Sequence, residues 1–239
     1  MLKFLVDMFF PPLCHNCREF IPNAGRVHVC EKCLTTSRPI QSPMCSCCGI
    51  PFATDEGISH LCGNCIAKHP PFDAACGAYL YEGAVKELIH RFKYDGRVQC
   101  RRPLALLLLE RLSGVVADFS PDLIIPVPLH KKRLRQRGFN QAILIGEVLA
   151  KEWRVPFERR LLQRIRWTEP QVNLAASERM ANVKGAFALR EPKLASGKRI
   201  VLVDDVLTTG STVAECSNVL KKAGALAVIA VTVARVAEN

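Results

Sequence analysis

Four C-x-x-C pairs near the N-terminus constrain the folding of this chain more than any other feature. They are Cys14/Cys17, Cys30/Cys33, Cys45/Cys48 and Cys62/Cys65. Each C-x-x-C forms a tight turn that points two thiolates at one ion, and two such turns complete a tetrahedral shell of four sulfurs. Twelve residues separate the first two pairs and thirteen separate the last two. The spacing therefore predicts two similar zinc ribbons, with two structural zinc ions.

The pattern leaves the pairing of the ligands open. Pairing by neighbours in the sequence is the simplest arrangement, but an interleaved arrangement, in which turns of both repeats share an ion, fits the spacing as well. Cys47 breaks the symmetry of the third pair and is either a spare thiol or a substitute ligand. Four protein sulfurs leave no open position on the metal, so we expect zinc to stabilise a small fold rather than to catalyse.

Charge and hydropathy narrow the class of partner. The 239 residues include 33 Lys and Arg against 22 Asp and Glu, a net charge of +11. Such an excess favours nucleic acid or phosphorylated small ligands, although a merely basic surface is the alternative.

The apolar start MLKFLVDMFFPP is interrupted by Asp7 and is too short to span a bilayer. We expect it to form a short helix packed on the protein, with a weak membrane-surface anchor as the alternative. We predict a cytoplasmic protein with reduced cysteines and no stable membrane insertion.

The chain changes character after residue 68. Amphipathic or buried helices are predicted over 84–94, 103–112, 139–153 and 211–225, and short apolar strands over 122–128, 185–189, 199–205 and 226–236. Continuous apolar strands that alternate with helices are typical of a parallel sheet covered on both faces. We therefore predict a double zinc ribbon over 1–68 and an open α/β domain over 69–239.

An acidic pair and a hydroxyl-rich loop stand at the end of one predicted strand, in RIVLVDDVLTTGSTVAE. In open α/β sheets, ligands bind beyond the carboxyl ends of the strands, which is where Asp204 and Asp205 are expected. The loop leads into a helix, whose N-terminus offers unpaired N–H groups and a partial positive charge to a phosphate. A ribose reconciles the acids with that phosphate, because its hydroxyls can donate to the carboxylates; Mg²⁺ could also screen them. Simple helix capping is the structural alternative.

The stretch VLVDDVLTTGST resembles the phosphoribosyl-pyrophosphate (PRPP) motif of type I phosphoribosyltransferases. The wider chain resembles the ComF family of competence-associated proteins, which join a double zinc ribbon to this fold. The resemblance includes IIPVPLHKKRLRQRGFNQA at 124–142 and a spaced polar set: Arg164, Arg166, Thr168, Gln171, Arg179 and Asn182. It implies that Asp204 and Asp205 bind the ribose hydroxyls and that the 5′-phosphate is held by Thr208, Thr209, Gly210, Ser211 and Thr212. It also implies a hood segment at about 75–100 and a pyrophosphate loop after Ile125, with Val127, Arg137 and Gly138.

Basic residues next to that loop suit a leaving pyrophosphate. Five of them crowd together: Lys131, Lys132, Arg133, Arg135 and Arg137. Guanidinium groups and Mg²⁺ would neutralise the developing charge. We predict that Arg137 contacts the ligand and takes part in catalysis. For Lys131, Lys132 and Arg133, ligand contact and a nucleic-acid patch fit equally.

The polar segment 164–183 is predicted to be a long loop that closes over PRPP. Arg179 would supply a cation on closure, with Gln171 and Asn182 as polar contacts. Two functions follow. The first is Mg²⁺-dependent transfer of a phosphoribosyl group from PRPP to an unknown acceptor, with release of pyrophosphate. The second is a nucleic-acid-binding accessory of natural transformation, non-catalytic or regulated by PRPP, whose partners would be single-stranded DNA and DNA-uptake proteins.

Overall fold

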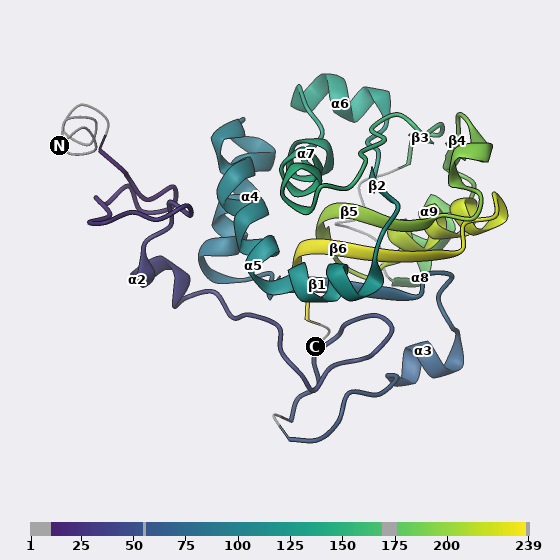
Figure 1. Cartoon of the computed structure of the whole chain (residues 1–239), viewed down its shortest axis with the longest axis horizontal. Coiled ribbons are helices and arrows are strands. Elements are labelled where there is room, and N and C mark those ends of the chain that lie inside the picture. The colour runs from purple at the N-terminus through teal and green to yellow at the C-terminus, as the bar shows by residue number, and fades with distance from the viewer. Residues whose placement is uncertain (1–10, 55, 169–175, 238–239) are drawn as a thin grey trace.

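A parallel sheet forms the centre of the molecule in a computed structural model that describes residues 11–54, 56–168 and 176–237. Its four strands lie in the order β1-β6-β5-β2, and all neighbours are parallel (Figure 1). Their bounds are Ala74–Leu80 for β1, Leu123–Pro126 for β2, Arg199–Leu207 for β5 and Ala227–Arg235 for β6. This confirms the predicted α/β class. The predicted N-terminal helix lies outside the described residues.

Helices cover both faces of this sheet. One face packs against α4 (Gly83–Tyr94), α5 (Arg101–Phe119) and α7 (Gln141–Trp153), and the other against α9 (Ser211–Lys222). Alternate residues of β5 serve the two faces, because successive side chains of a strand point to opposite sides. Val201 and Val203 belong to the core under α4, α5 and α7, whereas Ile200 and Leu202 belong to the core under α9.

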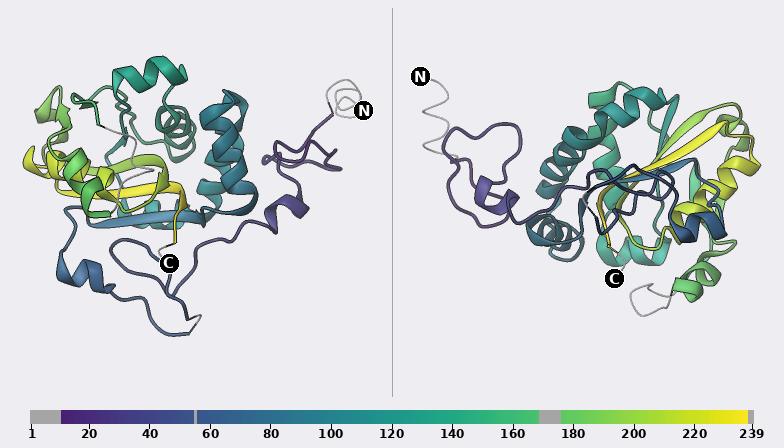
Figure 2. Two further views of the ribbon diagram at one scale, coloured as in Figure 1. Left: turned by 180° about the vertical axis from the view of Figure 1, so that it is seen from behind. Right: turned by 90° about the horizontal axis from the view of Figure 1, so that it is seen from below.

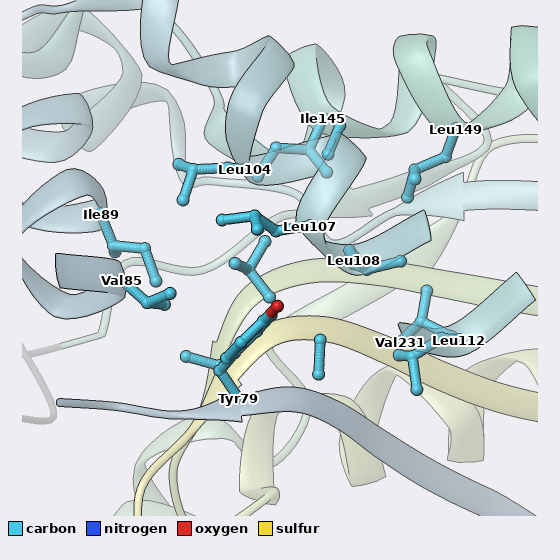
Figure 3. Packing of buried hydrophobic residues seen from close by; sticks show 14 of the residues in the cluster. Tyr79, Val85, Ile89, Leu104, Leu107, Leu108, Leu112, Ile145, Leu149 and Val231 are labelled. Atoms are coloured by element: carbon cyan, nitrogen blue, oxygen red, sulfur yellow. The ribbon is translucent and has the colours of Figure 1, made fainter. Parts of the chain in front are cut away.

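The core of the first face explains why the apolar run in α5 is helical. Leu104, Leu107 and Leu108 are at most 1% exposed and meet α7, α4 and the strands together (Figure 3). A helix that is apolar on most sides is stable only when it is buried. The run PLALLLLERL thus predicts a buried helix correctly, although the helix extends further at both ends.

Several segments differ from the sequence-based expectation. The basic run expected in the pyrophosphate loop forms helix α6 (Lys131–Arg137), because it contains no helix breaker and is capped at both ends. The His130 side chain accepts a hydrogen bond from the Lys132 backbone N–H, and Gly138 takes the left-handed conformation that ends the helix.

The strand predicted at 185–189 does not join the main sheet. It is β4 (Phe187–Leu189), which pairs antiparallel with β3 (Leu162–Arg164) in a separate two-stranded sheet. The expected long loop at 164–183 is in part regular structure, since its end is helix α8 (Ala176–Val183). Residues 169–175, with Gln171, lie outside the described part. Strand β1 was not predicted, and short 3-10 turns occupy η1 (Val98–Cys100) and η3 (Pro192–Ala195).

The two cysteine-rich segments lie against different parts of the α/β domain. In each of them the second C-x-x-C starts a short helix, α2 (Glu31–Leu34) and α3 (Gly63–Ala67). The first segment lies beside α4, where Arg91 Nη1 donates to the His15 carbonyl at 3.1 Å (Figure 2). In the view of Figure 1, the second segment lies below β1. Among the described helices, none combines the length and apolar character needed to cross a membrane.

Both edges of the sheet are covered by backbone hydrogen bonds. Along β1, the Ile40 N–H donates to the Ala78 carbonyl at 3.0 Å and the Ala75 N–H donates to the Cys47 carbonyl at 2.7 Å. Along β2, the Ile124 N–H donates to the Pro156 carbonyl at 2.8 Å. The chain between the two cysteine clusters and the first turn of the second cluster therefore close the β1 edge.

Candidate functional site

The eight predicted zinc ligands gather in two separate groups. The sulfurs of Cys14, Cys17, Cys30 and Cys33 lie within 4.8 Å of one another, and so do those of Cys45, Cys48, Cys62 and Cys65. The pairing is sequential, so the interleaved arrangement is not formed. Four mutually close thiolates are the ligand set of a structural zinc site.

Backbone N–H groups stabilise the thiolate form, which binds metal, of one cysteine in each group. The N–H groups of Asn16 and Cys30 lie 3.4 and 3.3 Å from Cys14 Sγ. Although burial opposes it, these donors lower the pKa of Cys14 to about 6, and the equivalent bonds do the same for Cys45. Cys47 lies outside both groups; it is 3% exposed, and burial raises the pKa of its thiol. It is therefore not part of the four-sulfur cluster.

The acidic pair lies within β5, two residues before the strand ends. Asp204 pairs in register with Thr232 of β6, and β5 continues to Leu207, opposite Arg235. On the other side, β2 ends at Pro126, opposite Val203. The predicted strand end is thus wrong by two residues, because pairing with β6 continues after β2 has ended. The acids lie where one side of β5 is no longer covered by a strand.

The two carboxylates face opposite sides of the sheet, as adjacent strand residues must. Asp205 faces α4, where its Oδ1 lies 2.7 Å from Lys93 Nζ, with side chains 9% and 16% exposed. Burial lowers the pKa of Lys93, but the charge and hydrogen bond of Asp205, together with the charges of Asp204 and Tyr81, outweigh burial, and the pKa is raised. Lys93 and Asp205 therefore form an ion pair that is largely removed from water.

Asp204 has a different environment. Among the described residues it has no ion-pair partner, and its Oδ1 accepts the backbone N–H of Asp205 at 2.8 Å. Burial and the charge of Asp205 raise the pKa of the Asp204 carboxyl to about 7, against a smaller opposite effect of Lys93. The two acids therefore differ: Asp205 is in an ion pair with Lys93, whereas the Asp204 carboxyl titrates near neutral pH.

The hydroxyl-rich loop turns directly from β5 into α9. Gly210 precedes the first helical residue with φ +76°, a left-handed conformation that glycine adopts without strain. The Thr209 and Ser211 hydroxyl oxygens lie 2.8 Å apart. The N-cap residue of α9 is Gly210, which has no side chain to cap the helix, and the Ser211 N–H donates to the Thr209 hydroxyl oxygen at 3.5 Å. This end of the helix is suited to an anion.

Helix α6 divides the basic run into two sets. Arg133 and Arg137 lie one turn apart on a half-buried face, whereas Lys131, Lys132 and Arg135 are exposed. Arg137 Nη1 donates to Gln141 Oε1 at 3.0 Å, and its guanidinium lies 5.3 Å from the centre of the Tyr94 ring. The helix is thus fixed with two guanidinium groups turned toward the protein.

A third arginine adds to these two. Arg164 of β3 is half-buried; its Nη2 donates to the Thr168 hydroxyl, and its Nε has no partner among the described residues. Burial lowers the pKa of Arg133 and of Arg164, and repulsion adds to it, from Arg137 in the first case and from Arg133 in the second. The described part shows no carboxylate in an ion pair with any of the three. Positive charge that is desolvated and unpaired favours the binding of an anion.

The remaining predicted residues are less informative. The Val127 carbonyl accepts a hydrogen bond from Asn140 Nδ2 at 3.0 Å, which holds the chain after β2. Arg166 donates to the carbonyls of Asn182 and Lys184 at 2.9 and 2.7 Å, a contact within its own region. Arg179 lies on α8, but its side chain is outside the described part, so its role stays a prediction.

Lys93 was missed by sequence reasoning. Its position four residues after the buried Ile89 continues the apolar stripe of α4, and that placement is the signal that could have identified it.

Two family models match this chain. Residues 5–83 match the double zinc ribbon domain and residues 142–239 match the phosphoribosyl transferase domain. Together with the fold and the site, these matches define a phosphoribosyltransferase-like protein with an N-terminal double zinc ribbon.

Relatives identify the family. DNA utilization protein YhgH of Escherichia coli K12 is 38% identical over 226 residues, covering 91% of this chain and 94% of YhgH. Competence protein F of Haemophilus influenzae is 34% identical over 223 residues, covering 90% and 93%. The chain belongs to the ComF family of these proteins, as its sequence predicted. Among solved structures, purine phosphoribosyltransferase from Pyrococcus horikoshii Ot3 is 17% identical and covers 55% of this chain and 83% of that one, with a TM-score of 0.37.

Proposed function

We propose that the site at the end of β5 binds PRPP and transfers its phosphoribosyl group to an acceptor, with release of pyrophosphate. The observation that carries this proposal is the grouping of complementary features along one chain segment. An acidic pair, a hydroxyl-rich turn and the N-terminus of α9 follow one another within nine residues, 204–212. Desolvated arginines, which form no ion pair with a carboxylate of the described residues, add the charge that a pyrophosphate requires.

Each part of the site matches one part of PRPP. Asp204 and Asp205 would accept the ribose hydroxyls, and the turn from Thr208 to Thr212 would hold the 5′-phosphate. Arg133, Arg137 and Arg164 would bind the pyrophosphate and stabilise its charge as it leaves. Mg²⁺, bound together with the substrate, would supply further positive charge at the pyrophosphate. We place the domain boundary after residue 68 and the protein in the cytoplasm as part of the same proposal.

Calorimetry with Mg²⁺ and PRPP tests the proposal. In the double variant Asp204→Asn/Asp205→Asn, binding should weaken by about 1.5–3 kcal/mol, the size of a hydrogen bond to a charged group. Asp118→Asn, on the exposed side of α5, is the matched control and should bind like the parent. Unchanged affinity in a folded double variant would refute the proposal. If PRPP binding depends on the two acids, release of pyrophosphate that requires both PRPP and cell extract would show that the extract contains an acceptor.

The exposed face of α6 favours a second function. Lys131, Lys132 and Arg135 are exposed, and two relatives are named for DNA utilization and competence. We propose that this face binds single-stranded DNA and thereby places the protein with DNA-uptake partners. Each lysine replaced by Ala should lower the slope of log K against log salt by about 0.7. Arg137→Ala should weaken PRPP binding and leave DNA binding unchanged. No DNA binding at low salt would refute this second function.

A further inference from the structure

Lys93 is held firmly beside the acidic pair. The residue before it, Phe92, is fully buried and stacks on Phe139 with ring centres 5.2 Å apart. Phe139 lies at the start of the turn into α7, so the end of α4 and the chain after α6 are packed together. The position of the ammonium at Asp205 is therefore set by packing of the core rather than by a mobile surface side chain.

A buried ion pair is a poor device for stability alone, because the two charges must first be removed from water. The surroundings of Lys93 suggest another use. The ionisable groups that act on its charge are Asp205, Asp204 and Tyr81. The ammonium contacts one oxygen of Asp205, Oδ1. Among the described residues, the second oxygen, Oδ2, makes no hydrogen bond that would compete with a ligand hydroxyl.

We propose that the Lys93 ammonium is the built-in cation of the acidic pair, so that the ribose 5-phosphate part of PRPP binds there without a divalent metal ion. This inference rests on the proposed function. A metal ion at Asp205 would have to bind beside an ammonium that already lies 2.7 Å from the carboxylate, and the two like charges would repel. The need for Mg²⁺ is then confined to the pyrophosphate end of the substrate.

Ribose 5-phosphate is the probe that separates the two ends, because it lacks pyrophosphate. Calorimetry uses the full zinc-loaded chain in buffer freed of divalent ions by a resin, since a soluble chelator would remove zinc. The parent should bind with the same affinity, within about twofold, with and without Mg²⁺. Lys93→Met should lose about tenfold or more without Mg²⁺, which corresponds to a lost hydrogen bond to a charged group. Mg²⁺ should restore that loss, and Lys93→Arg should bind without it.

Lys221→Met is the matched control. Lys221 Nζ lies 2.8 Å from Asp73 Oδ2 in a second lysine–aspartate pair, which adjoins neither the acidic pair nor the hydroxyl-rich turn. This variant should bind like the parent with or without Mg²⁺. If Lys93→Met does not fold, Lys93→Gln takes its place, and the parent measured with and without Mg²⁺ decides independently.

The outcomes separate this inference from the proposed function. A parent that binds ribose 5-phosphate only with Mg²⁺ overturns the inference and leaves the proposed function standing. A folded Lys93→Met that binds without Mg²⁺ as the parent does, or whose loss Mg²⁺ does not restore, also overturns it. A parent that binds neither ribose 5-phosphate nor PRPP under either condition overturns both.

Discussion

Neutralising the two adjacent acids one at a time should change folding stability in opposite directions. Asp205→Asn leaves the buried Lys93 ammonium without its counter-charge, whereas Asp204→Asn removes a carboxyl that has no cation partner among the described residues. Residues that are neighbours in the sequence, with the same substitution, would thus give opposite signs. A general effect of losing a negative charge could not explain that result.

The structure sets the size of each effect. Breaking a buried ion pair typically costs about 3–5 kcal/mol, and since Asn still offers an oxygen to Lys93 we expect about 2–3 kcal/mol of destabilisation for Asp205→Asn. The folded state raises the pKa of Asp204 from its usual range to about 7. A raised pKa means that the folded state keeps a proton that the unfolded state has lost, so stability is highest below the unfolded value of 3.8, falls as the pH rises toward about 7 and is constant above it. Asp204→Asn should therefore gain about 1 kcal/mol or more at about pH 8, less at about pH 5.5 and least near about pH 4.

Urea unfolding followed by tryptophan fluorescence measures both effects. The only tryptophans of the chain are Trp153 and Trp167, and both lie in the α/β part, so the signal reports that part rather than the ribbons. Destabilisation of 2–3 kcal/mol should lower the midpoint by about 1 M urea. Equal shifts for the two variants, or a stabilised Asp205→Asn, would refute the assignment of Lys93 to Asp205 alone.

Other expectations follow from zinc, pH and packing. Metal analysis should give close to two zinc ions for the parent and for Cys47→Ser, and about one for Cys14→Ser, because Cys47 lies outside both clusters. A parent with one zinc ion or none would contradict the two-ribbon assignment. Calorimetry should show PRPP affinity rising as Asp204 ionises through about pH 7, and a flat profile in Asp204→Asn. Leu107→Ala, at 1% exposure, should cost about 2–5 kcal/mol in urea unfolding, and a loss under 1 kcal/mol would contradict the packing shown in Figure 3.

Much of the fold could be predicted from local patterns. The helix at 84–94 has apolar residues at helical spacing, and the strands at β2, β5 and β6 are apolar runs bounded by turns or prolines. The four C-x-x-C turns predicted both clusters, but not their pairing, because the spacing fits two arrangements. Strand β1 was missed since its sequence AACGAYL contains small residues and a glycine, which weaken a strand signal.

The site was predictable in part for a related reason. The acidic pair and its loop are contiguous in the sequence, so one motif predicted them together. Lys93 comes from a helix more than 100 residues away, and only the packing of α4 on the sheet brings it to Asp205. The side chains of Asp204 and Asp205 point to opposite faces of the sheet because β5 continues past them, and the length of β5 is set by its pairing with β6.

The covered β1 edge has a consequence for the protein without zinc. An uncovered edge strand offers free N–H and C=O groups to any other extended chain and promotes aggregation. Here the donors and acceptors of that edge are occupied by residues 38–40 and by the first turn of the second cysteine cluster. Metal loss from that cluster would thus release a protective cover as well as unfold a small module. Zinc-depleted protein should precipitate or form edge-to-edge oligomers while its sheet is still folded. Zinc would therefore keep the protein soluble by keeping the β1 edge covered.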